Sequence, residues 1–117
     1  MKTFLAVYTG TPGALEAWRS LPEQELKARE ERGIKAWHGW ADRNKAAIVE
    51  MGGPLGRTKR VSREGISDIR NNMGAFTVVR AESHEAAAKI FVDHPHFTIF
   101  PGEAIEIMEV LAVPMKA

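Results

Sequence analysis

Two histidines separated by one proline are the most prominent candidates for chemistry in the chain. They lie in the segment Asp93-His94-Pro95-His96. Histidine is the side chain best suited to proton transfer near neutral pH. Because proline holds the residue before it in an extended conformation, we expect the two rings to point to the same side. The pair then serves as acid or base in a pocket, caps the end of a helix, or binds a metal with help from Asp93 or Glu106. No third ligand stands at a diagnostic spacing, so we expect no metal.

A second group of candidates is the segment Trp37-His38-Gly39-Trp40. On a helix the two tryptophans share a face, while His38 points about 100° away from its neighbour Trp37. One interpretation is a core anchored by tryptophan, with His38 at an interface. The other is a pocket in which His38 is a base and Trp40 stacks on a flat ligand.

The stretch 56–63 contains four basic residues, among them Arg57 and Lys59, and Asp68 follows it. Such side chains attract phosphate or carboxylate groups. A solvated loop and a nucleic-acid contact are the alternatives. The stretch lacks the order of a P-loop and the interleaved aromatic residues of an RNA-binding surface. We therefore expect contact with an anionic small molecule or with solvent, and no nucleic-acid partner.

Three charged residues fall on expected strands: Arg80, Glu106 and Glu109. A charge on an inner sheet face is costly unless it is paired. Glu106 beside His96 or Arg80 would form an acid–base site, and an ion pair at the surface or between subunits is the alternative. In a regular strand, Glu106 and Glu109 point to opposite faces.

The composition limits the class of protein. The 117 residues suit a single domain, 1–117, and the mixture of 44% hydrophobic and 26% charged residues is typical of folded proteins. A net charge of +1 argues against a dedicated nucleic-acid binder. The absence of cysteine excludes disulfides, thiolate catalysis and iron–sulfur clusters. No apolar stretch approaches the roughly 20 residues of a membrane span, and residues 1–8 do not resemble a signal peptide, so we expect a cytoplasmic protein without a membrane partner.

These residues must be positioned by a small set of elements. Ser20-Leu21-Pro22-Glu23 has the spacing of a capping box, which predicts the start of a long helix. Pro95 is expected to end the last helix, and the polar stretch 54–73 is expected to be a long loop that closes over a ligand. We expect strands over 3–8, 47–51, 75–81 and 104–113, and helices over about 14–20, 23–45 and 84–93.

This order predicts an α+β protein with the ferredoxin-like βαββαβ arrangement, a four-stranded antiparallel sheet with its helices on one face. Alternation places Phe4, Ala6 and Tyr8 on one side of the first strand and Leu5 and Val7 on the other. The last strand offers Ile105, Ile107 and Leu111 on one side, Met108 and Val110 on the other. Because both faces are apolar and the helices cover only one, we expect a homodimer that packs sheet against sheet around a cavity.

Five segments resemble YCII-related proteins: Met51–Leu55, Gly74–Ser83, Glu85–Ala87, Asp93–Phe97 and Ile105–Met108. The fourth is similar to the family's Asp-Pro segment after the second helix, and the last to its closing Ile-Glu-Val strand. The resemblance covers roughly 35–113. It implies a dimeric α+β barrel. Some relatives act on small aromatic breakdown products, and related folds include muconolactone isomerases and cofactor-free monooxygenases.

The resemblance also bears on single residues. His38 is similar in placement to a helical histidine of the family, and Asp93 matches the aspartate of the Asp-Pro segment. Gly52 and Gly53 occupy the neighbourhood where some members carry the aspartate that partners that histidine.

The leading hypothesis is a YCII-like dimer whose cavity binds a small anionic or aromatic molecule without a cofactor. As an enzyme it would perform lyase- or isomerase-type proton transfer, with His96 or His38 as the base and Glu106 or Asp93 orienting it. The alternative is a dimer that binds or senses a small molecule without converting it. The expected ligand contacts are Trp40, Arg57, Lys59, Asp68, Arg80 and His94.

Overall fold

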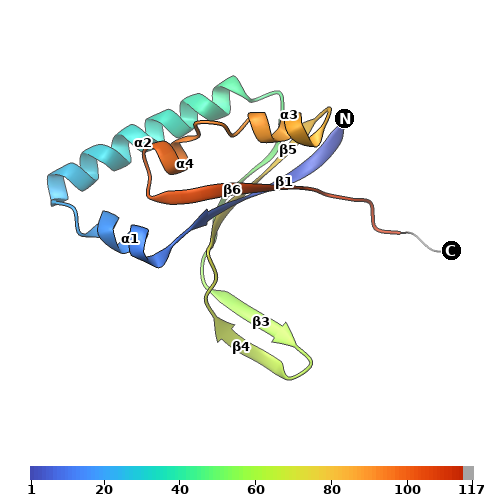
Figure 1. Cartoon of the computed structure of the whole chain (residues 1–117), viewed down its shortest axis with the longest axis horizontal. Helices are drawn as coiled ribbons and strands as arrows, with labels where there is room; N and C mark the ends of the chain where they lie inside the picture. Colours follow the sequence, from blue (N-terminus) through green and yellow to red (C-terminus); the bar gives the residue numbers. More distant parts are fainter. Residues whose placement is uncertain (115–117) are drawn as a thin grey trace.

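A four-stranded antiparallel sheet forms the centre of the molecule in the computed structural model, which describes residues 1–114. The order of its strands in space is β2-β5-β1-β6 (Figure 1). All four predicted strands are present, each with slightly different ends. They are β1 (Lys2–Gly10), β2 (Ile48–Pro54), β5 (Met73–Ala81) and β6 (Gly102–Glu109).

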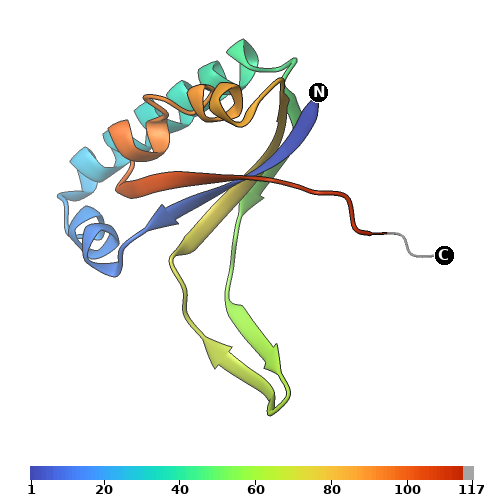
Figure 2. The same cartoon turned by 45° about the vertical axis from the view of Figure 1, so that its right-hand side comes forward.

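The helices α2, α3 and α4 lie together on one face of this sheet (Figures 1 and 2). The element order and strand order confirm the predicted α+β, ferredoxin-like βαββαβ fold. Side-chain caps begin three helices: Thr11 accepts from the N–H of Ala14, Ser83 from that of Ala86, and His94 from that of His96. The helices are α1 (Pro12–Arg19), α2 (Glu23–Arg43), α3 (His84–Lys89) and α4 (Pro95–Thr98).

Two predicted helix boundaries are wrong. Ser20 ends α1 instead of capping α2, which begins after Pro22 without a side-chain cap. Pro95 does not stop a long third helix: α3 ends at Lys89, and Pro95 opens the short helix α4. Proline is well suited to the first turn of a helix because the N–H that it lacks has no partner there.

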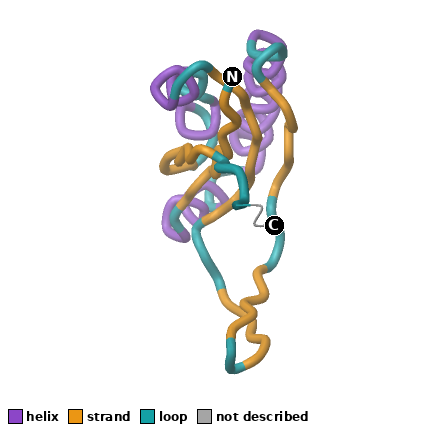
Figure 3. Tube along the Cα trace, turned by 90° about the vertical axis from the view of Figure 1, so that its right-hand side faces the viewer, coloured by secondary structure: helices purple, strands orange, loops and turns teal. Residues whose placement is uncertain are grey.

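The predicted loop 54–73 is also wrong, because most of it forms a β-hairpin. Strand β3 (Thr58–Ser62) pairs in antiparallel fashion with β4 (Gly65–Ile69). Gly65 at the turn has a φ of +112°, which glycine adopts at little cost. Figure 3 shows the hairpin separated from the sheet by a connecting segment on each side. We call residues 56–70 the arm.

The core lies between the sheet and the helices. Phe4, Ala6 and Tyr8 of β1 are buried there, as the alternation predicted. Ile105 and Ile107 of β6 pack against the same core. The prediction for Leu111 is wrong, because it lies beyond the end of β6 and is exposed.

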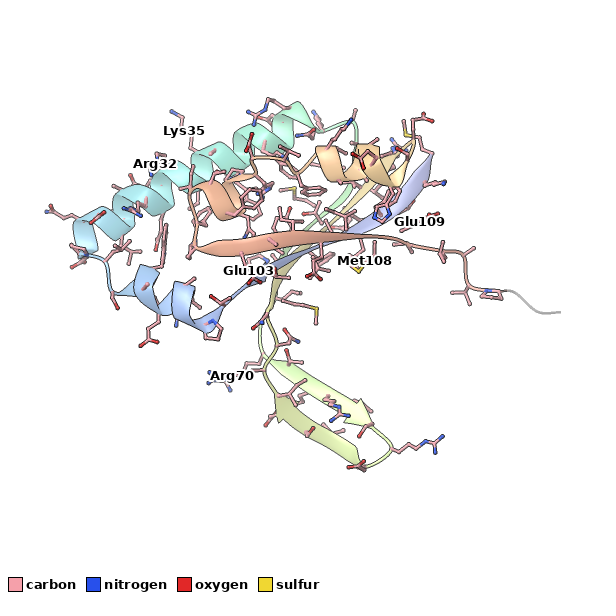
Figure 4. All side chains as sticks on the ribbon, in the orientation of Figure 1. Arg32, Lys35, Arg70, Glu103, Met108 and Glu109 are labelled. Carbon is pink, nitrogen blue, oxygen red and sulfur yellow. The ribbon has the colours of Figure 1, made fainter. Side chains whose placement is uncertain are left out.

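Over the other face of the sheet, the described residues 1–114 form no helix (Figures 1 and 2). Cross-strand pairing aligns Leu5 with Val78 and Met108, and Val7 with Phe76 and Glu106. Figure 4 shows Met108 on the side of β6 away from the helices and its neighbour Glu109 on the other side. We call this surface the open sheet face. It comprises Leu5, Phe76, Val78 and Met108 around Val7, which its neighbours already bury, with the charged residues Glu50, Arg80 and Glu106.

Within residues 1–114, no helix combines the length and the apolar character that a membrane crossing requires.

Candidate functional site

Both histidines of the segment 93–96 are found under the helices, in contact with aromatic rings. We call Tyr8, Trp37, Trp40, His94 and His96 the histidine–aromatic cluster. The ring centres of His94 and His96 both lie 5.2 Å from that of Tyr8, edge to face. His94 also lies 4.4 Å from each of the two indole rings. The sequence therefore predicted correctly that the two imidazoles share one side. The expected extended backbone is found at His94, whereas His96 lies in the helix α4.

His94 is fully buried, and its ring caps a helix. The backbone N–H of His96 donates to Nδ1 of His94 at 2.9 Å, so the side chain caps the start of α4. The proton of the neutral ring is therefore on Nε2, which is buried and has no hydrogen-bond partner in the described part of the chain. Burial, helped by repulsion from His96, lowers the pKa of His94 to about 3. At neutral pH this ring is neutral and serves as a cap and a packing element, so it is not an imidazolium that could act as an acid.

His96 is less deeply buried and is held by the first strand. Its Nε2–H donates to the carbonyl oxygen of Thr9 at 2.7 Å, since a carbonyl only accepts. Burial lowers the pKa of His96, while backbone hydrogen bonds at Thr9 and Ala104 oppose that shift. Gly102 packs so closely on this residue that a Cβ there would clash with it. The neutral ring keeps an unprotonated Nδ1, the atom at which His96 would accept a proton.

Tyr8 completes the cluster through a short hydrogen-bond chain. Its hydroxyl lies 2.9 Å from that of Thr77, which donates in turn to the carbonyl oxygen of Met51 at 2.9 Å. Burial raises the pKa of Tyr8 to about 12, although the bond to Thr77 acts in the other direction. The phenol therefore stays protonated and ties β1 to β5 and β2. The chain Tyr8–Thr77–Met51 was not predicted, because Tyr8 stands in an apolar run with nothing to mark its hydroxyl as paired.

Trp40 and His38 do not take the positions expected of ligand contacts. Trp40 is buried, and its indole N–H donates to the carbonyl oxygen of Ile90 at 2.8 Å, so its ring is occupied by packing. His38 is exposed on α2. The structure thus favours the interpretation of Trp37 and Trp40 as core anchors.

Glu106 and His96 lie on opposite sides of the sheet. Glu106 is paired with Val7 and projects from the open sheet face, whereas His96 contacts Tyr8 under the helices. Since alternate residues of a strand point to opposite faces, the carboxylate does not orient this imidazole. Arg80 shares the face of Glu106 but pairs with Thr3, four residues along β1 from Val7. The expected contacts of Glu106 with His96 and with Arg80 are therefore not formed.

Asp93 lies in a groove between α2 and α4 of about 420 Å³. Its φ of +60° places it in the left-handed region, which aspartate tolerates better than most residues. Arg32, Lys35 and Arg43 line the same groove, and the first two project from α2 away from the sheet (Figure 4). Asp93 therefore joins a basic groove on the helix layer, separate from the open sheet face.

The remaining predicted contacts, Arg57, Lys59 and Asp68, belong to the arm. The ammonium of Lys59 donates to the carboxylate of Asp68 at 2.7 Å, across the hairpin. Both side chains are exposed, so this ion pair adds little stability. The structure places these residues away from the histidines.

No metal site emerges in the part of the chain that the structure describes. Among residues 1–114, His, Asp and Glu side chains do not gather in groups of three or more. His94 and His96 stand together, but one ring nitrogen of each is taken by a backbone group.

The open sheet face differs from the cluster because its groups lack partners from helices. Val78 and Phe76 are half-buried, Met108 is 44% exposed, and Glu106 and Arg80 are exposed beside them. A row of apolar side chains with a few charges is typical of a ligand or subunit surface. Sequence alternation placed Leu5, Val7 and Met108 on one side of their strands but did not place Phe76 or Val78. It also did not predict that Glu50 joins them, because bulges in β2 shift its register.

No family model matches this chain, and no curated protein matches its sequence. Among solved structures, the chain is similar to the 5-chloro-2-hydroxyhydroquinone dehydrochlorinase TftG from Burkholderia phenoliruptrix AC1100, in a complex with 2,5-dihydroxybenzoquinone. The two chains share 20% identity and superpose with a TM-score of 0.54, over 91% of this chain and 90% of the other. This likeness shows that the chain has the α+β fold of that protein.

Proposed function

We propose that the protein is a YCII-related homodimer that packs sheet against sheet and binds a small anionic or aromatic molecule between the two sheets. The observation that carries this proposal is the open sheet face, an apolar surface left bare by the helices and set with Glu50, Arg80 and Glu106. A second copy would bury the apolar residues and enclose the charged ones.

The nature of the ligand follows from the charges and from the fold. Arg80 would meet a carboxylate or an acidic oxygen, and Phe76 would offer a ring to a flat molecule. The similar dehydrochlorinase was solved with 2,5-dihydroxybenzoquinone, a small planar molecule rich in oxygen. This supports the same class of ligand here.

The geometry favours binding over acid–base catalysis by the predicted pair. His96 is a neutral imidazole with a lowered pKa, but Glu106 is on the other side of β6. If the protein converts its ligand, the charged groups of the open sheet face must handle the proton, with no cofactor. The non-catalytic binding module is therefore the function that we place first.

The test measures binding of 2,5-dihydroxybenzoquinone and of small aromatic carboxylates by thermal shift and calorimetry. We expect Arg80→Ala to abolish binding and Glu106→Gln to change it. The matched control is Glu109→Gln, on the same strand but opposite Phe4 and thus on the helix side. Mass spectrometry of the recovered compound separates binding from conversion.

Two results would count against the proposal. One is that no compound of this class stabilises the protein. The other is that a compound binds equally well to the wild type, Arg80→Ala and Glu106→Gln, which would place its site elsewhere.

A further inference from the structure

Among residues 1–114, the two strands of the arm make substantial contact with each other and with no further helix or strand. Every residue from Lys59 to Gly74 is exposed. The radius of gyration is 16.5 Å, against about 13 Å for a compact domain of this length. An isolated two-stranded hairpin is at best marginally stable in water. We therefore expect the arm to pack against another surface that stabilises it.

One face of the arm carries an apolar pair. Val61 lies directly opposite Ile66, and the two are 76% and 72% exposed. The ion pair of Lys59 with Asp68 stands on the same face, two residues away. The other face has Arg60 opposite Ser67. Paired β-branched side chains on one face are typical of a strand surface that is covered.

The direction of the arm indicates which surface it packs against. It projects from the sheet on the side away from α2, α3 and α4 (Figures 1 and 2). This is the side of the open sheet face. A second copy that faces this sheet would therefore have the arm alongside it.

Charge also favours a second copy of this chain. Between residues 56 and 70, five basic and two acidic side chains give a net charge of +3. Because the whole chain carries +1, the remainder carries −2. Two of the exposed acids, Glu50 and Glu106, are on the open sheet face. The arm of one copy and the body of another are thus complementary.

We infer that the arm is a clasp: its Val61–Ile66 face lies against the body of a second copy, where its basic side chains meet Glu50 and Glu106 at the edge of the shared cavity. This inference rests on the proposed sheet-to-sheet dimer. It adds that each subunit completes the ligand site of the other with positive charge.

The test is the dimer dissociation constant, measured by sedimentation equilibrium. We expect Val61→Asp to raise it by about thirtyfold or more, as the loss of a central apolar contact does. Ser62→Asp is the matched control, with the same new charge one residue along and on the opposite face of the hairpin. It is expected to change the constant by less than about threefold.

Hydrogen exchange covers the case in which Val61→Asp merely unfolds the hairpin. In the wild-type dimer, the amides of residues 58–69 should be protected. In Val78→Asp, which removes the sheet contact without touching the arm, they should exchange freely.

The outcomes separate the two proposals. If the wild type is a dimer and Val61→Asp dimerises with unchanged affinity, the clasp is wrong and the sheet-to-sheet dimer remains. The same holds if the arm instead binds nucleic acid. Equal exchange of the arm in wild type and Val78→Asp overturns the clasp as well. A wild-type monomer contradicts the proposed function itself.

Discussion

The two faces of the sheet are built from the same strands, but one is buried under helices and the other is exposed. On the helix side, Phe4 and Tyr8 are fully buried, and hydroxyl and backbone groups there are tied into a cap and a hydrogen-bond chain, although Nε2 of His94 is not. On the open sheet face, Val78 and Met108 stand beside charges that no helix covers. The comparison teaches that His94 and His96, the most prominent chemical candidates, belong to the packed core on the helix-covered face. We propose that the ligand and the second subunit bind to the other face, whose packing is incomplete.

The largest expected effect is a loss of stability when the packing on the helix-covered face is disrupted. Trp40→Ala removes a buried indole and its hydrogen bond to Ile90, and should lower the free energy of unfolding by about 3–5 kcal/mol. Trp18→Ala, which truncates a partly exposed indole on α1, should cost clearly less. Chemical denaturation measures both. Equal losses would show that the cluster is no more tightly packed than the periphery.

The matching change on the open sheet face should act on association instead. Val78→Asp places a charge opposite Leu5 and Glu50. We expect the variant to keep the secondary structure of the wild type and to sediment as a monomer, because the charge would be buried without a partner in the dimer. A variant that unfolds, or one that remains a dimer, would contradict the assignment of this face.

The next effect in size is the pH dependence of stability that the buried His94 causes on the helix-covered face. The His94 ring titrates near 6.5 when unfolded but has a pKa of about 3 in the folded chain. Below pH 6.5 the unfolded chain therefore binds a proton that the folded chain does not, and stability falls by up to about 1.4 kcal/mol per pH unit until the pH nears 3. Above neutral pH the ring has no such effect.

His94→Asn tests this slope in denaturation experiments across that pH range. Asparagine still accepts the N–H of His96 as a helix cap but does not titrate. The variant should lose most of the acid sensitivity, and the part due to His96, whose pKa is also lowered, should remain. An unchanged slope would show that His94 is not the buried titrating group.

The smallest effect compares two glycines of α2. A Cβ at Gly33 would lie 2.5 Å from the ring of Phe100, whereas one at Gly39 would lie 3.3 Å from the flexible end of Arg43. Gly33→Ala should destabilise by about 1 kcal/mol after its gain in helix propensity, and Gly39→Ala should stabilise by a similar amount. Thermal unfolding gives the sign of each. The reverse order would contradict the close packing at Gly33.

Much of the fold was predictable because it depends on local patterns. Alternation along 3–8 and 104–113 grouped the residues that face the core, such as Tyr8 and Ile107, and the helix expected from about residue 84 begins at His84. The arm was missed because neither of its strands, Thr58–Ser62 and Gly65–Ile69, alternates apolar with polar residues, and Val61 is the single apolar residue of the first. Hairpin pairing there is set by the turn at Gly65, which apolar periodicity does not reveal.

The candidate site was less predictable, because it depends on which face each side chain takes. His94 and His96 were expected together and are together. Their distance from Glu106 follows from the side of β1 that each contacts, which no spacing in the sequence encodes. The burial that lowers the pKa of His94 comes from Trp37 and Trp40, more than fifty residues earlier in the chain.

Sedimentation equilibrium of the unmodified chain, at micromolar concentration and moderate salt, tests the central claim most directly. If the open sheet face is a subunit surface, the mass should be twice the 13.0 kDa of one chain. A stable mass of 13.0 kDa would contradict it.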